Sequence, residues 1–132
     1  DDWYFNMRFR DGKAGVKDIL VAKPSDAVRD GPYVHPKGPY PHIQAAKGRP
    51  ETMMWAVERP DGGRGFGFTG GHFHLNWQND DQRRLILNAL VWLAKLEVPK
   101  QGVDSPAVSE VEIMQNLDEK KPAAKKAAPT KK

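Results

Sequence analysis

The chain has 132 residues, which is enough for one ordinary domain with a core and too few for two. It contains no cysteine, and this excludes disulfides, thiolate metal sites and a cysteine nucleophile. The net charge of +4 comes from the last thirteen residues, which hold six lysines and no acid, whereas residues 1–119 carry 15 basic and 17 acidic side chains, a net of −2. We therefore expect no nucleic-acid partner, and no membrane partner either, since no apolar run approaches about 20 residues.

The N-terminal third predicts two strands and a long loop. Apolar and polar residues alternate over residues 3–9, and residues 16–22 form a short, mostly apolar run between turn-forming segments. About thirty residues dense in proline and glycine follow, as far as residue 51. A loop of this length is usually functional or disordered, and we expect it to be ordered and to cover the surface. Its two histidines, His35 and His42, are interpreted as solvent-exposed rather than as parts of a lid.

The middle of the chain predicts a hairpin followed by a helix. Residues 52–59 and 66–71 flank a Pro-Asp-Gly-Gly turn. Asn79 or Asp80 can cap the helix, which we expect to end near residues 95–97 and to be buried on more than one side because it is so apolar. A short helix is predicted within residues 109–120, and the Lys/Ala/Pro tail beyond it is expected to be disordered.

The stretch GFGFTGGHFHLNW, residues 65–77, holds the candidate functional residues. Its first glycines have the spacing G-x-G-x-x-G, but phenylalanines alternate with them as in a strand, so we do not interpret them as a phosphate-binding loop. The loop that follows lies between strand and helix, where α/β sheets bind ligands. His72 and His74 are therefore candidate acid–base groups or ligands. Trp55 and Trp77 are interpreted first as core residues.

Two interpretations of the histidine pair stay open. If the strand continued through them, alternation would turn both imidazoles to one side, about 7 Å apart at the backbone, where they could share a divalent metal with a third ligand. In the other interpretation, one histidine bonds to the loop backbone and the other faces water.

Three segments in this order, DDWYFNMRF, ILVAKP and GRGFGFTGGHFHLNWQNDDQRRLILNALVWLAKLE, resemble the ThuA-like (trehalose-utilisation) family. The matching residues are Asp1, Asp2, Tyr4, Phe5, Gly63, Arg64, Phe66, Phe68, Gly71, His72, Trp77, Arg83, Arg84, Leu87, Asn88, Trp92 and Ala94. The resemblance implies an α/β fold, the C-terminal part of a flavodoxin-like (class I glutamine amidotransferase-like) three-layer sandwich. It divides the chain into a domain portion at 1–98, an extension with a short helix at 99–118 and a disordered tail at 119–132.

The resemblance also implies carbohydrate metabolism on trehalose-like or keto-disaccharide sugars. By this match His72 is the candidate catalytic acid/base, Asp2 positions or polarises it, and Tyr4 bonds to sugar hydroxyls. The candidate sugar-binding residues are Trp77, His74, Tyr33 and Tyr40.

Several features of this protein stay open at this point. No cofactor is predicted, apart from the divalent metal left open at His72 and His74. The expected partner is a small sugar, and a homo-oligomer is left open. The reaction could be that of a hydrolase or of a lyase or isomerase, in an exported, periplasmic or cytoplasmic protein. The alternative function is a non-catalytic carbohydrate-binding or regulatory module that retains the fold.

Overall fold

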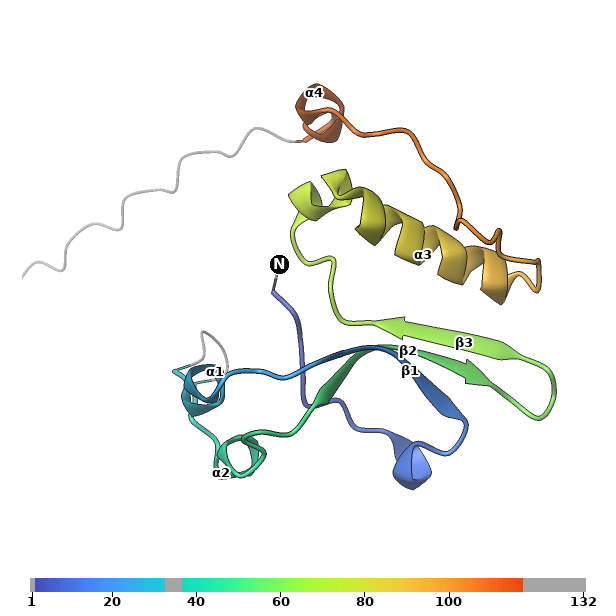
Figure 1. The fold of residues 1–132 in the computed structure, drawn as a ribbon. Coiled ribbons are helices and arrows are strands. Elements are labelled where there is room, and N and C mark those ends of the chain that lie inside the picture. The colour runs from blue at the N-terminus through green and yellow to red at the C-terminus, as the bar shows by residue number, and fades with distance from the viewer. Residues whose placement is uncertain (1, 33–36, 118–132) are drawn as a thin grey trace, which may run out of the picture.

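A three-stranded antiparallel sheet, in the order β1-β2-β3, forms the centre of the molecule (Figure 1). The computed structural model describes residues 2–32 and 37–117. In chain order the elements are the 3-10 helix η1 (Arg10–Lys13), β1 (Val16–Ala22), α1 (Asp26–Asp30), α2 (Pro41–Gln44), β2 (Glu51–Glu58), β3 (Arg64–Phe68), the 3-10 helix η2 (His74–Gln78), α3 (Asp80–Leu93) and α4 (Glu110–Ile113). In the view of Figure 1, α3 lies above the sheet, α1 and α2 lie to its left, and η1 lies below it.

The fold is a small mixed α/β domain, so the predicted α/β class is confirmed at this level. Both strand pairings are antiparallel, and β1 occupies the predicted residues 16–22. The hairpin is also confirmed, with Asp61 accepting a hydrogen bond from the Gly63 amide (2.8 Å) in its turn. The second strand of the hairpin ends at Phe68 rather than at residue 71.

The strand predicted at residues 3–9 does not form. Asn6 has a φ of +65°, which interrupts an extended conformation and prevents a continuous ladder. The apolar alternation of the segment has another cause, because its aromatic rings pack on the sheet. Trp3 meets Phe68 edge to face (5.2 Å between ring centroids), and Phe9 meets Trp55 in the same way (5.1 Å).

Helix α3 begins as the sequence predicts and ends slightly earlier. The Asn79 side chain caps it by accepting from the Gln82 amide (2.9 Å). The helix ends at Leu93, close to Lys95, whose φ of +61° leaves the helical region. Leu90 remains 54% exposed, so the burial of α3 is less complete than its apolar sequence predicts.

A buried ion pair fixes the proline- and glycine-rich segment to the sheet. Arg29 on α1 is fully buried and donates to Glu51 on β2 (2.8 Å), and Arg49 donates to the same carboxylate (2.8 Å). Burial alone would raise the pKa of Glu51, but the hydrogen bonds from the two arginines outweigh it and lower that pKa. The segment therefore has fixed structure where it is described. Tyr33 and His35 lie outside the described residues.

The extension after α3 runs back along that helix towards α4 (Figure 1). Asn88 accepts from the Val103 amide (2.7 Å), and Arg83 donates to the Ser105 hydroxyl (3.2 Å) and the Pro106 carbonyl (2.9 Å). These contacts fasten the extension to α3. The short helix predicted in this region forms as the single turn α4, with a capping box, and the tail at 119–132 lies outside the described residues.

Candidate functional site

Tyr4 and His72 form a hydrogen-bonded pair just beyond the end of β3. The Tyr4 hydroxyl lies 2.9 Å from His72 Nδ1, and the two rings are tilted by 54° with centroids 5.9 Å apart. Gly71, with a φ of +82°, turns the chain between the strand and His72, a conformation that glycine adopts without strain. The other ring nitrogen, Nε2, has no hydrogen-bond partner among the described residues, so it is the atom that can meet a ligand.

Aromatic packing brings Tyr4 to this place from 68 residues away. The Tyr4 amide donates to the Thr69 carbonyl (3.4 Å), and the neighbouring Trp3 packs on Phe68. Gly70 leaves room for both rings, because a Cβ there would lie 2.8 Å from Phe68 Cζ and 3.0 Å from Trp3 Cζ2. A side chain at position 70 would therefore disturb the segment that carries Tyr4.

The pair borders an open hollow of about 350 Å³. Its lining consists of Tyr4, Met7, Trp55, Phe68, Thr69, Gly70, Gly71 and His72. Trp55 on β2 faces Gly67 on β3, and its indole fills the space that a side chain at Gly67 would occupy, since a Cβ there would lie 2.1 Å from Trp55 Cζ2. The hollow thus combines aromatic walls with two polar groups, which suits a ligand that has both an apolar face and hydroxyls.

Tyr4, rather than Asp2, contacts His72, the candidate catalytic residue. Asp2 is exposed, does not line the hollow, and makes no hydrogen bond or ion pair with the described residues. The predicted polarisation of His72 by Asp2 therefore has no counterpart in this geometry. A tyrosine hydroxyl orients the imidazole instead.

His74 has a different environment from His72. The strand has already ended, and His74 begins η2, where its Nε2 lies 2.7 Å from the Ile113 carbonyl oxygen of α4. The alternation that would place both imidazoles on one side is therefore absent, and the two rings bond to different partners. Within the described part of the chain, no three His, Asp or Glu residues are grouped so that they could hold a metal ion.

The remaining predicted sugar-binding residues do not line the hollow. Trp77 lies in η2 at its border, 3.6 Å from the place of a Cβ on Gly71, and its carbonyl accepts from Arg83 (2.7 Å). Tyr40 precedes α2, and its ring packs against His42, which is exposed as predicted. Tyr33 is not among the described residues.

Trp55 and Met7 are among the lining residues that sequence reasoning missed, and both lie outside the stretch at 65–77. Trp55 was interpreted as core, yet the turn at residues 60–63 fixes the hairpin register, and that register pairs Trp55 with Gly67. A tryptophan opposite a glycine is a readable signal, because the indole can lie across the neighbouring strand. Met7 carried no such signal.

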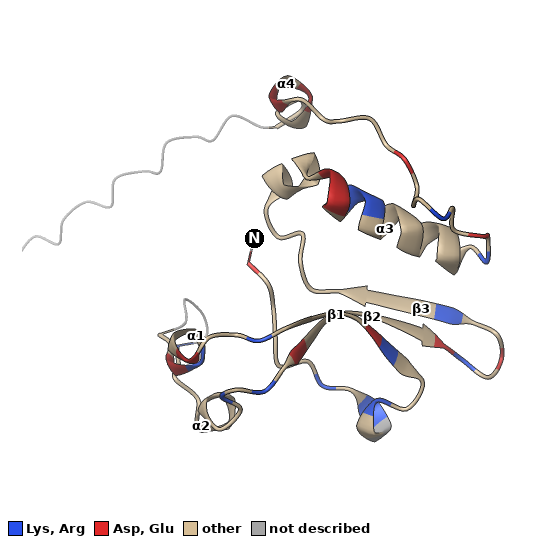
Figure 2. Cartoon of the chain, in the orientation of Figure 1, with Lys and Arg blue, Asp and Glu red and all other residues tan. Residues whose placement is uncertain are grey.

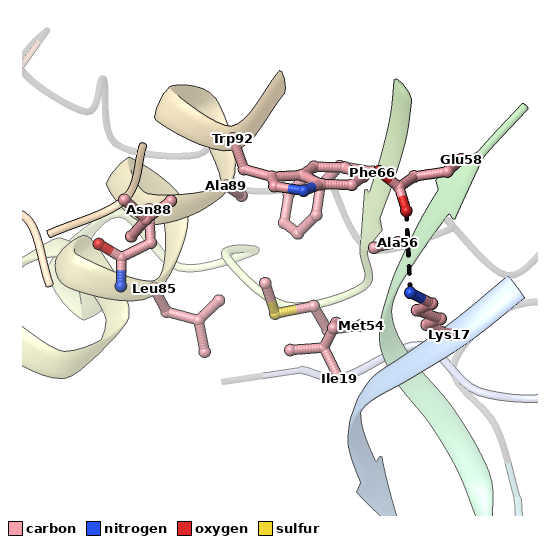
Figure 3. A pocket seen from close by; sticks show the side chains of 11 residues that line it. Lys17, Ile19, Met54, Ala56, Glu58, Phe66, Leu85, Asn88, Ala89 and Trp92 are labelled. Atoms are coloured by element: carbon pink, nitrogen blue, oxygen red, sulfur yellow. Dashed lines mark ion pairs between the residues drawn. The ribbon is translucent and has the colours of Figure 1, made fainter. Parts of the chain in front are cut away.

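A second hollow, of about 330 Å³, lies between the sheet and α3 (Figure 3). Most of its lining is apolar, with Phe66 and Trp92 on one side and Met54 facing them. The ion pair Lys17–Glu58 (3.7 Å) stands at its edge, and both side chains are largely exposed. Its lining contains no histidine, so it offers no group whose ordinary pKa lies near neutrality.

Comparisons with known proteins leave the site to be interpreted from its geometry. No family model, no curated protein and no solved structure matches the chain. In the part of the chain that the structure describes, none of the helices is long and apolar enough to span a membrane.

Proposed function

We propose that this protein is a ThuA-like sugar-processing enzyme in which His72 acts as the general acid/base. In this proposal the chain forms the C-terminal part of a flavodoxin-like (class I glutamine amidotransferase-like) domain. The substrate is a trehalose-like or keto-disaccharide sugar bound in the hollow beside His72. The observation that carries the proposal is the 2.9 Å hydrogen bond between Tyr4 and His72 at the border of an aromatic hollow.

The Tyr4 hydroxyl fixes the orientation of the imidazole, and its oxygen can either donate a hydrogen bond to Nδ1 or accept one from it. When the ring is protonated, Nδ1–H donates to the Tyr4 oxygen and Nε2–H is the acid that gives its proton to a sugar oxygen. When the ring is neutral and its proton is on Nδ1, Nε2 is the base. An imidazole can therefore serve in either direction, which is what acid–base chemistry on a sugar hydroxyl requires.

The walls of the hollow suit the two kinds of surface on a sugar ring. The C–H face of a pyranose is apolar and packs against aromatic side chains such as Trp55 and Phe68. Its hydroxyl edge needs hydrogen-bond partners, and Tyr4 and His72 provide them.

Arg83 and Asn88, two of the residues that carry the family resemblance, also make hydrogen bonds that stabilise this part of the fold. Arg83 donates to the Trp77 carbonyl (2.7 Å) and so holds η2, the helix that follows His72, against α3. Asn88 holds the extension through Val103. Arg83 thus helps to keep the segment that follows His72 in place.

The test is turnover of trehalose and 3-keto-disaccharides by the complete gene product. We expect His72→Ala to lower kcat by about 100-fold or more, the usual contribution of a general acid/base, and Tyr4→Phe to lower it less. His42→Ala is the matched control, because His42 is exposed and lies outside the hollow; it should leave turnover unchanged.

Three results would contradict the proposal. Full activity of His72→Ala would remove the histidine from the chemistry. Loss of activity in a chelator would favour a metal-dependent reaction over metal-free acid–base catalysis. Sugar binding without turnover of any substrate would favour a non-catalytic carbohydrate-binding module.

A further inference from the structure

The hollow beside His72 has no formally charged side chain in its lining, although 29% of the residues in the chain are charged. The segment that forms much of it, residues 65–79, contains no Asp, Glu, Lys or Arg. Figure 2 shows this part of the chain in tan between β3 and the charged start of α3. A ligand in the hollow therefore meets rings, a thioether, hydroxyls and backbone.

The cations that contact neighbours of the lining are already paired with carboxylates. Lys13 lies over the ring of Phe9 (4.9 Å), but it is bonded to Asp18 (2.9 Å). Arg49 donates to Asn6, the residue before Met7, and its other partner is Glu51 (2.8 Å). Neither cation is available to neutralise an anionic ligand.

Two charged residues stand close to the lining along the chain, and neither takes part in it. Asp2 lies two residues before Tyr4, Arg8 directly follows Met7, and both are exposed and outside the lining. Phosphate and carboxylate groups are usually bound by arginine, lysine or the amides of a helix N-terminus, because leaving their charge unpaired on desolvation is costly. An uncharged sugar leaves no charge unpaired when it enters the hollow.

We propose that the hollow selects uncharged pyranose sugars and rejects phosphorylated sugars and sugar acids. This inference rests on the proposed function and adds the class of substrate. Met7 and Trp55 are the specificity-determining residues, since they line the hollow and present no charge to the ligand.

The first experiment compares the binding of trehalose and of its 6-phosphate by calorimetry and NMR at low salt. We expect the phosphorylated sugar to bind at least tenfold more weakly. Two indole N–H signals locate the ligand: Trp55 lines the hollow beside His72, and Trp92 lines the one under α3. Trehalose should shift the Trp55 signal and leave Trp92 unchanged.

The second experiment places a cation in the hollow. Met7 is 36% exposed, so Met7→Lys can be accommodated, and we expect it to raise the affinity for the 6-phosphate about tenfold at low salt, with less gain in 0.5 M salt. Leu75→Lys is the matched control: Leu75 is 55% exposed in η2 and outside the lining, so this variant adds the same charge without changing the preference.

The outcomes separate this inference from the function on which it rests. Equal or tighter binding of the 6-phosphate by the wild type, with a shift of Trp55, would overturn the charge selectivity and leave a sugar site beside His72. An equal gain from Met7→Lys and Leu75→Lys would also overturn it. If no sugar binds, or if only Trp92 responds, the proposed function fails and this inference fails with it.

Discussion

Replacing Gly67 by alanine tests whether glycine at this position builds the wall of the hollow. Gly65 and Gly67 lie two residues apart on β3, so a Cβ added at either would point to the same face of the sheet. At Gly67 that atom would lie 2.1 Å from Trp55 Cζ2, whereas at Gly65 the nearest atom is Val57 Cβ at 3.9 Å. The first substitution must displace an indole ring, and the second makes an ordinary contact.

The two substitutions are expected to change the free energy of unfolding differently. Forcing extra atoms into a packed site costs roughly 1–3 kcal/mol, and moving Trp55 away from Phe9 removes an edge-to-face contact worth about 0.5–1.5 kcal/mol. Alanine recovers about 0.5–1 kcal/mol of backbone entropy at either position. We expect Gly67→Ala to lower the free energy of unfolding by roughly 2 kcal/mol, and Gly65→Ala to leave it unchanged or raise it slightly.

Urea unfolding at pH 7 measures both free energies, and the Trp55 indole signal reports the position of the ring. Gly67→Ala should shift that signal and weaken sugar binding, while Gly65→Ala should do neither. If the two variants unfold within about 0.5 kcal/mol of each other with the Trp55 signal unmoved, the indole is not confined by Gly67 and the reasoning is refuted.

Three further variants test the contacts that hold the site. Glu51→Gln should lower the free energy of unfolding by roughly 3 kcal/mol in urea at pH 7, because Arg29 is fully buried and loses its carboxylate partner. Folding lowers the pKa of Glu51, so the difference in unfolding free energy between variant and wild type should narrow as the pH falls below the ordinary value of 4.5. A difference that stays constant there would contradict this. Arg83→Met should cost about 3 kcal/mol and speed amide exchange over residues 103–108, and unchanged exchange would show that the extension is held by other contacts. His74→Ala should cost about 1 kcal/mol and speed exchange in α4 while turnover persists, whereas loss of turnover would give His74 a catalytic role.

Local signals in the sequence were enough for the elements whose stability is local. The apolar run at 16–22 and the Pro-Asp-Gly-Gly turn predicted β1 and the hairpin. Asn79 predicted the start of α3, because its side chain satisfies an amide within its own first turn. The segment at 3–9 has the period of a strand, but the φ of Asn6 and the packing of Trp3 are not readable from alternation.

The candidate site was only partly accessible from the sequence for the same reason. A glycine pair after a strand pointed to His72, and the family resemblance brought Tyr4 into the site as a sugar-binding residue. The hydrogen bond between them joins positions 68 residues apart, so no local pattern predicts it. The partner of His74 is likewise distant, since Ile113 lies 39 residues further along the chain.

Gly65, Gly67 and Gly70 have the spacing of a phosphate-binding fingerprint, but the packing of this fold gives another reason for glycine at two of these positions. That reason bears on the choice of ligand. A phosphate loop uses glycine to bring its amides against the anion. Here the indole of Trp55 lies over Gly67, and the rings of Trp3 and Phe68 crowd Gly70. Only Gly65 has no ring within contact distance, its nearest neighbour being an aliphatic carbon. Rings occupy the space at Gly67 and Gly70 that a phosphate would need, and Gly70 itself lines the hollow. The hollow is apolar at this point, and this favours an uncharged sugar as its ligand.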